Sequence, residues 1–142
     1  ARAGDLLIAM TGATLGKFAI VPQHNETVLI NQRVGKFALG DEPLEKLPFL
    51  WCLLKQEHVY NEIVNRGQGS AQPNISPTDI MTIPILIPPG NVLDKFNESL
   101  RSIFEMITFT LAENEKLAAL RDTILPRLMS GELSVADLKD IT

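Results

Sequence analysis

Two glycines and a lysine near the N-terminus have the residue types of a phosphate-binding loop. In the segment AMTGATLGKF, residues 9–18, Lys17 directly follows Gly16 and an apolar run precedes the loop. A P-loop needs four residues between its first glycine and the Gly-Lys pair, then a Ser or Thr for magnesium. Gly12 and Gly16 enclose only three residues, and Phe18 stands where the hydroxyl is needed. The spacing therefore argues against a nucleotide-binding enzyme.

Other residue types that carry catalysis or bind metals are sparse. His24 and His58 have no carboxylate or cysteine at ligand spacing, so the sequence predicts no metal site. Cys52 is the single cysteine, which excludes an internal disulfide and suits a reducing cytoplasm. Its apolar surroundings, LPFLWCLLK, favour a small buried side chain over a reactive thiol. Since no nucleophile, base and orienting group are visible together, we expect no catalytic residue and no cofactor.

The charge is distributed unevenly along the chain. Residues 1–91 hold seven Lys or Arg and eight Asp or Glu, whereas residues 92–142 hold six and nine, within a net charge of −4. Three windows contain bases without acids, namely 6–25, 27–40 and 63–78. A surface that faces DNA needs such local positive windows more than a basic total. The other explanation stays open, because short acid-free windows also arise by chance when charges are this sparse.

Length and hydropathy limit the class of protein. A chain of 142 residues accommodates one domain, or a small domain with an appendage. No apolar run approaches the ~20 residues of a membrane span, and the first residues, ARAGD, lack the pattern of a signal peptide. We therefore expect a cytoplasmic protein without a membrane segment.

Short elements are predicted for the first ninety residues. Residues 5–10 and 18–22 have strand character on either side of the glycine loop, and 27–39 alternates apolar and polar residues. Apolar residues at helical spacing predict one amphipathic helix over 42–66, entered through Pro48. The remaining expectations are a left-handed cap at Gly67, a loop over 70–80, and a strand at a sheet edge or bulge over 81–88, because it contains Pro84.

The last third predicts one long helix. No Pro or Gly interrupts Val92–Leu125, and 34 residues would span roughly 51 Å. Pro126 should end or kink this helix, and Gly131 should close a last turn. A body this small cannot cover the apolar stripe over its full length, so the stripe predicts a partner helix, and an inward Asn commonly fixes register in such pairs. The residues expected to pair are Leu100, Ile103, Ile107, Leu111, Asn114, Leu117, Ile124 and Leu128.

Four segments in this order resemble the specificity subunit of type I restriction-modification systems. They are GDLLIAMTGATLGKFAI, INQRVGKF, RGQGSAQPNIS followed by DIMTIPILIPP, and a long helix ending LRDTILPRLMSGEL. The resemblance covers nearly the whole chain and corresponds to the latter part of a target recognition domain with its spacer helix. It implies an α+β fold: a small mixed α/β partial recognition domain over 1–90, a coiled-coil spacer or dimerisation helix over 91–131, and a tail over 132–142.

The resemblance also implies function and partners. The chain would be a non-catalytic subunit that recognises double-stranded DNA, reading one half of a bipartite site. It would scaffold methyltransferase subunits, and a restriction subunit in the full complex, and would form a homodimer or pair with another specificity half through the long helix. Catalysis would lie in the partner subunits. The alternative is a helix-mediated assembly module without DNA binding of its own, which the negative total charge favours.

On this resemblance, two loops and the segment INQR supply groups that suit DNA. Arg pairs with guanine, and Asn or Gln with adenine, while exposed amides and lysines contact phosphate. The expected DNA-binding residues are Thr11, Thr14, Lys17, Arg33, Arg66, Gln68, Ser70, Gln72 and Asn74. Structural roles stay open for several of them. The segment 72–74 could form a turn that pins the chain, Asn31 and Gln32 could bond the backbone, and Arg33 could be a solvated charge.

Overall fold

Three short antiparallel strands form the sheet that carries the glycine loop. In the computed structural model, which describes residues 1–24, 28–68 and 72–134, these strands are β1 (Leu6–Ala9), β2 (Phe18–Ile20) and β3 (Val34–Lys36). The sheet order is β2-β1-β3, and Ile8 of β1 lies opposite Phe18 on one side and Gly35 on the other. The two strands expected beside the loop are confirmed. The strand expected over 27–39 is limited to β3.

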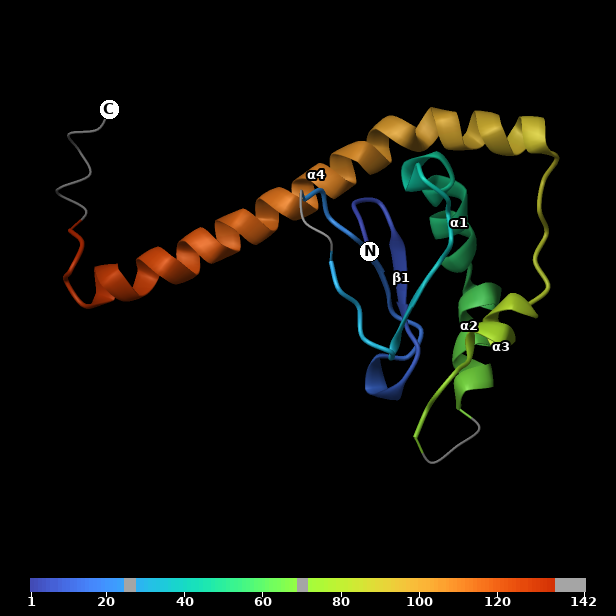
Figure 1. Ribbon diagram of the computed structural model, residues 1–142, viewed down its shortest axis with the longest axis horizontal. Helices are drawn as coiled ribbons and strands as arrows, with labels where there is room; N and C mark the ends of the chain where they lie inside the picture. Colours follow the sequence, from blue (N-terminus) through green and yellow to red (C-terminus); the bar gives the residue numbers. More distant parts are fainter. Residues whose placement is uncertain (25–27, 69–71, 135–142) are drawn as a thin grey trace.

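The core lies between this sheet and two helices. Leu6 and Ile8 are buried because alternate side chains of a strand point to the same face. They pack with the buried faces of α1 (Leu47–Leu54) and α2 (Glu57–Gly67), which include Leu53, Val59 and Ile63. A sheet with helices packed on it makes the fold α+β, as predicted (Figure 1).

The single helix expected over 42–66 is wrong, because the chain forms two helices there. A short 3₁₀ turn, η2 (Pro43–Glu45), precedes α1, and Gln56 adopts an extended conformation that separates α1 from α2. The break lets each helix turn its own apolar residues toward the core. Cys52, within α1, is exposed, so the expected burial of its thiol is wrong.

The strand expected over 81–88 is also wrong. Residues Pro77–Met81 form the short helix α3, and no strand forms in the stretch 82–89 that follows it. Pro84, Pro88 and Pro89 have no amide proton to donate to a sheet. The Leu86 side chain in this stretch is 90% exposed, so neither sheet nor core covers it.

A 40-residue helix, α4 (Gly90–Met129), completes the described chain. At ~1.5 Å per residue it is about 60 Å long, and its C-terminal half extends beyond the body (Figure 1). The helix continues through Pro126 for one more turn, and Gly131 follows with φ 74°, the left-handed conformation expected there. No helix in the described ranges is long and apolar enough to cross a membrane.

The first half of α4 is fastened to the body. Phe104 is buried in the core, and the buried Asn97 side chain accepts a hydrogen bond of 2.9 Å from the Phe49 amide. Phe49 lies in the first turn of α1, where backbone amides have no partner within their own helix. Asn97 therefore both docks α4 and caps α1. Farther along, the Thr108 carbonyl accepts a bond of 3.1 Å from the Gln23 amide.

The predicted helix-pairing residues divide between two faces of α4. Leu100, Ile107 and Leu111 pack against the chain's own core. Ile103 is 52% exposed and Leu117 is 61% exposed. Asn114 is also exposed, whereas Ile124 and Leu128 are half-buried. The apolar surface left open is continued by Met106, Phe109, Leu120, Leu125 and Met129.

Candidate functional site

Three backbone segments meet at the end of β1. The Met10 amide donates to the Arg33 carbonyl at 2.9 Å, and the Ile75 amide donates to the Met10 carbonyl at 3.0 Å. Next to them, the Gly12 amide donates to the Pro73 carbonyl at 2.9 Å. These bonds hold the glycine loop, the chain before β3 and the chain before α3 in fixed register, although up to 64 residues separate them in sequence.

The side chains at this junction line a polar depression. One part has a volume of about 400 Å³, and its walls are Thr11, Gln32, Arg33, Gln72, Pro73 and Asn74. An adjoining hollow of about 320 Å³ shares Thr11, Arg33 and Gln72 and adds Thr14 and Asn31. Hydroxyl, amide and guanidinium groups supply the polar part of both linings, and neither contains an acidic residue among the residues that the structure describes. Such an arrangement can donate to and accept from several polar groups at once.

The structure brings together five of the nine predicted DNA-binding residues. They are Thr11, Thr14, Arg33, Gln72 and Asn74, which come from three separate segments. Lys17, Arg66 and Gln68 are not in either lining, and Ser70 lies outside the described residues. Gln32 and Asn31 belong to the depression but were absent from the predicted set. The sequence feature that could have indicated Gln32 and Asn31 is the acid-free window 27–40. It indicates the segment but not which of its side chains face the depression.

Arg66 ties two helices together instead of facing this depression. Its guanidinium Nη1 donates to the Asp79 carbonyl at 3.0 Å and to the Thr82 hydroxyl at 2.7 Å. Its Nε donates to Glu62 at 3.1 Å, one turn earlier in α2. Nε and Nη1 of this guanidinium thus bond residues of α2 and of α3 and its C-cap, which favours a structural role for Arg66.

The glycine loop does not present a cradle of free amides. The short 3₁₀ turn η1 (Gly12–Thr14) occupies its centre, and Gly12 and Gly16 adopt φ of 70° and 80°, which glycine reaches without strain. The amides of Gly12, Leu15, Gly16 and Lys17 donate to carbonyls within the protein. The idea that this loop offers exposed amides to phosphate is wrong at these four positions. The Thr11 hydroxyl, in contrast, does not cap η1.

A compact turn shapes the Arg33 side of the depression. The Asn31 side-chain oxygen accepts from the Arg33 amide at 2.8 Å, and the Asn31 carbonyl accepts from the Val34 amide at 3.1 Å. The expectation that Asn31 bonds the backbone is confirmed. For Gln32, no such bond is formed within residues 1–24, 28–68 and 72–134.

The opposite side is anchored by a helix cap. The Ser76 hydroxyl accepts from the Asp79 amide, and the Asp79 carboxylate accepts from the Ser76 amide, which together form a capping box at the start of α3. Hydrogen bonds from the Ser76 hydroxyl and then its amide lower the pKa of Asp79, and the nearby Arg66 charge adds to this effect. The Asn74 amide donates to the Gly67 carbonyl at 2.8 Å. The segment 72–74 does therefore pin the chain.

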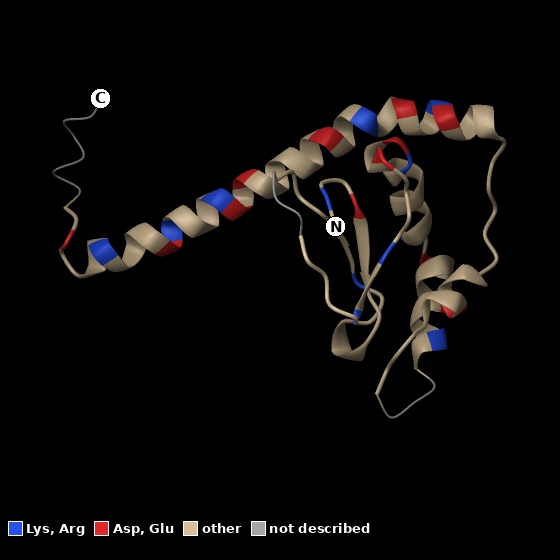
Figure 2. Cartoon of the chain, viewed as in Figure 1, with Lys and Arg blue, Asp and Glu red and all other residues tan. Residues whose placement is uncertain are grey.

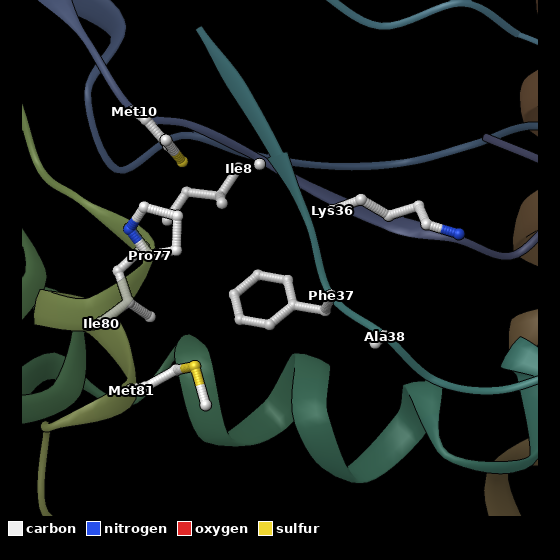
Figure 3. Close-up of a pocket in the computed structure, with 9 residues that line it drawn as sticks. Ile8, Met10, Lys36, Phe37, Ala38, Pro77, Ile80 and Met81 are labelled. Atoms are coloured by element: carbon white, nitrogen blue, oxygen red, sulfur yellow. The ribbon is translucent and has the colours of Figure 1, made fainter. Parts of the chain in front are cut away.

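A second hollow on the body is chemically different. Between the sheet and α3, Ile8, Met10, Phe37, Ile80 and Met81 surround a space of about 400 Å³ (Figure 3). Lys36 also borders this space, but its ammonium points away from it and lies 3.1 Å from Asp5 (Figure 3). The surface of this hollow is mainly apolar, which suits a polar ligand less well than the polar depression does.

The charge pattern distinguishes the two ends of the body. Asp and Glu are frequent along α4 and beside the start of α1, whereas Lys or Arg without acids lie next to the Gly12–Thr14 turn (Figure 2). All three segments that form the polar depression come from the acid-free windows of the sequence. The depression thus lies at the end of the body that is best suited to an anionic partner.

Comparisons with known proteins identify similar chains. Residues 2–118 match the family described as type I restriction modification DNA specificity domain. The MjaVIII type I restriction enzyme specificity subunit of Methanocaldococcus jannaschii is 28% identical over 140 residues, covering 96% of this chain and 33% of that protein. The MjaIX specificity subunit of the same organism is 36% identical over 94 residues, covering 66% and 21%. The HindI specificity subunit of Haemophilus influenzae is 29% identical over 122 residues, covering 85% and 26%. The chain thus spans a third or less of these relatives.

Proposed function

The chain belongs to the family of type I restriction-modification DNA specificity domains, and from this membership we propose that it recognises a base sequence in duplex DNA. The polar depression is the observation that carries the proposal. Arg33, Thr11 and Asn74 converge there from different segments, and the described residues of the lining include no acidic side chain. Guanidinium, hydroxyl and amide groups are the side chains that read base edges, and a fixed backbone holds them in place.

We also propose that the recognition covers one half of a bipartite site. α4 acts as the spacer, because its C-terminal half extends beyond the body and keeps an open apolar stripe. A second specificity half, or a second copy of this chain, lies along that stripe, and methyltransferase subunits dock on the paired helices. The restriction subunit joins the full complex, and catalysis resides in these partners.

Binding of duplex DNA tests the proposal directly. The chain, alone and with a methyltransferase subunit, is titrated with a pool of labelled duplexes while anisotropy is measured at several salt concentrations. We expect binding that weakens steeply with salt, because phosphate contacts release counterions. Arg33→Ala should reduce the affinity by about 1–3 kcal/mol.

A charge-matched control separates a specific loss from a loss of net charge. Arg121 lies on α4, is exposed and pairs with the adjacent Asp122. Arg121→Ala removes the same charge far from the depression and should leave DNA affinity nearly unchanged. Absence of duplex binding at low salt, with and without the methyltransferase subunit, contradicts DNA recognition.

An assembly module is the second candidate function. The observation that favours it is the open stripe of α4, where Leu117 and Leu120 are more than half exposed. A chain that pairs with a second helix or a methyltransferase, but binds no duplex in either state, would be assigned this function instead.

A further inference from the structure

We propose that Gln32 reads an adenine, next to a guanine that Arg33 reads, so that the Asn31–Val34 turn is a two-residue base-reading tip. This inference rests on the proposed function and deepens it. Gln32 was expected to bond the backbone, but it lies in the wall of the polar depression beside Arg33. Neither side chain makes a hydrogen bond within the described ranges of the chain.

The turn is built to present these two residues. The Asn31 side-chain oxygen accepts a hydrogen bond from the Arg33 amide at 2.8 Å, and the Asn31 carbonyl accepts one from the Val34 amide at 3.1 Å. The Arg33 carbonyl in turn accepts from the Met10 amide at 2.9 Å, which fixes the turn to the end of β1. The backbone of the tip is therefore set before a ligand arrives, and only two side chains lose freedom on binding.

The chemistry of the pair points to bases more than to phosphates. A neutral amide gains little from a phosphate charge, but its oxygen and NH₂ match the N6 and N7 edge of adenine. A guanidinium matches O6 and N7 of guanine in the same bidentate way. Adjacent residues of one tight turn reach adjacent positions, so the target should contain an adenine beside a guanine.

Gln32 is a better amide reader than Gln72 on the opposite wall. Gln72 already takes part in an interaction within the chain. Asn74 is tied through its backbone amide to Gly67, and its segment is bonded to the glycine loop. The opposite wall is thus held by contacts within the chain, whereas the turn of residues 31–34 presents two side chains without a hydrogen-bond partner among the described residues.

Selection from a randomised duplex pool tests the assignment. The full chain with its methyltransferase subunit is compared with Gln32→Ala and Gln32→Glu. We expect the unmodified protein to enrich adenine at one position, and Gln32→Ala to lose that preference alone, with affinity for the selected duplex reduced about 5- to 150-fold. Gln32→Glu should change the preference at that position to cytosine, because a carboxylate accepts from the cytosine amino group.

Gln56→Ala is the matched control, since Gln56 is exposed, makes no side-chain cap bond to α2 and lies outside the depression. It should keep both affinity and preference. An unchanged base preference in Gln32→Ala and Gln32→Glu overturns the assignment while leaving DNA recognition intact. If the unmodified protein enriches no sequence, the proposed function itself fails, and the assignment fails with it. Circular dichroism of each variant verifies the fold. Because Gln32 is exposed, its replacement should leave the fold unchanged.

Discussion

Arg33 and Arg66 carry the same charge but differ in what their guanidinium groups contact. Arg66 donates to Glu62, Asp79 and Thr82, and so connects α2 with α3. Arg33 is exposed in the wall of the polar depression. A guanidinium that is engaged within the fold contributes to stability, whereas one that faces a ligand contributes to binding.

Arg66→Ala should therefore lower the free energy of unfolding by about 1–2 kcal/mol, mainly through the lost bonds to the Asp79 carbonyl and the Thr82 hydroxyl. The ion pair with Glu62 adds little, because both side chains are partly exposed. Arg33→Ala should change the same quantity by less than about 0.5 kcal/mol. Urea denaturation of the two variants and the unmodified protein measures both values. Equal stability of the two variants would contradict the division of roles.

At this scale the sequence predicts which segments supply a polar surface but not which side chains face it. The acid-free windows and the types of Thr11, Arg33, Gln72 and Asn74 are visible in the sequence. The partner of Arg66 depends on α3, a helix that local patterns did not indicate. The turn that exposes Gln32 depends on how a neighbouring Asn31 uses its side chain. The Arg66 partner is thus set by a tertiary contact, and the turn by a local side-chain bond that the sequence permits but does not require.

Gly67 illustrates an element that is positioned by the absence of a side chain. It ends α2 without a left-handed conformation, so the predicted cap is wrong. A Cβ at this position would lie 2.5 Å from Cδ1 of Leu15, which is buried. The glycine therefore allows α2 and the loop after η1 to approach closely.

Gly67→Ala should destabilise the protein by up to about 2 kcal/mol, because overpacking of ~1–3 kcal/mol exceeds the gain of ~1 kcal/mol in helix propensity. In a Leu15→Ala background the clash is absent, so the same change should stabilise the protein. Leu15→Ala alone should cost about 2–5 kcal/mol. Thermal and urea unfolding of the unmodified protein, the two single variants and the double variant gives a double-mutant cycle. A destabilising effect of equal size in both backgrounds would exclude the close packing as the cause.

The capping box of α3 makes stability depend on pH. Bonds from Ser76 lower the pKa of Asp79, so its charged form is favoured by folding. The contribution is fully present above the ordinary pKa of an aspartate and is lost as pH falls through the lowered pKa of the folded state. Ser76→Ala should therefore be less stable than the unmodified protein at pH 7, and the difference should shrink in acid. Urea unfolding across this range measures the difference, and a gap that widens in acid would contradict the role of Asp79.

Elements with a strong local pattern were predictable, and those that depend on burial or on capping were not. β1, β2 and α4 follow from alternation or from an uninterrupted helical pattern. The break at Gln56 and the five-residue α3 depend on burial and on reciprocal capping by Ser76 and Asp79. The run ILIP, residues 85–88, has the composition of a strand but forms none. Its apolar pattern alone does not show whether a neighbouring strand is available for pairing.

At the scale of the molecule, α4 is shared between two surfaces. Phe104 faces the body and is 5% exposed, whereas Leu117 and Leu120 are 61% and 54% exposed beyond it. The sequence predicted that the helix is too long for its body to cover, but it merged the two faces into one stripe. Leu100, Ile107 and Leu111 already have partners in the core. The surface available for a second helix is thus formed by Ile103, Met106, Leu117 and Leu120.

The division of α4 predicts that folding and assembly can be changed separately. Replacing Leu117 and Leu120 together by Glu places two charges in the open stripe, which should abolish pairing with a second helix and leave the stability of the single chain nearly unchanged. Phe104→Ala should instead cost about 3–5 kcal/mol of stability, because it empties a packed position. Sedimentation equilibrium over a range of concentrations measures assembly, and urea unfolding measures stability. If the unmodified protein stays monomeric at high concentration and does not associate with its methyltransferase subunit, this stripe is excluded as the pairing surface. The same conclusion holds if the double Glu variant assembles as the unmodified protein does. Because the two sets of residues lie on different faces, each variant is the control for the other.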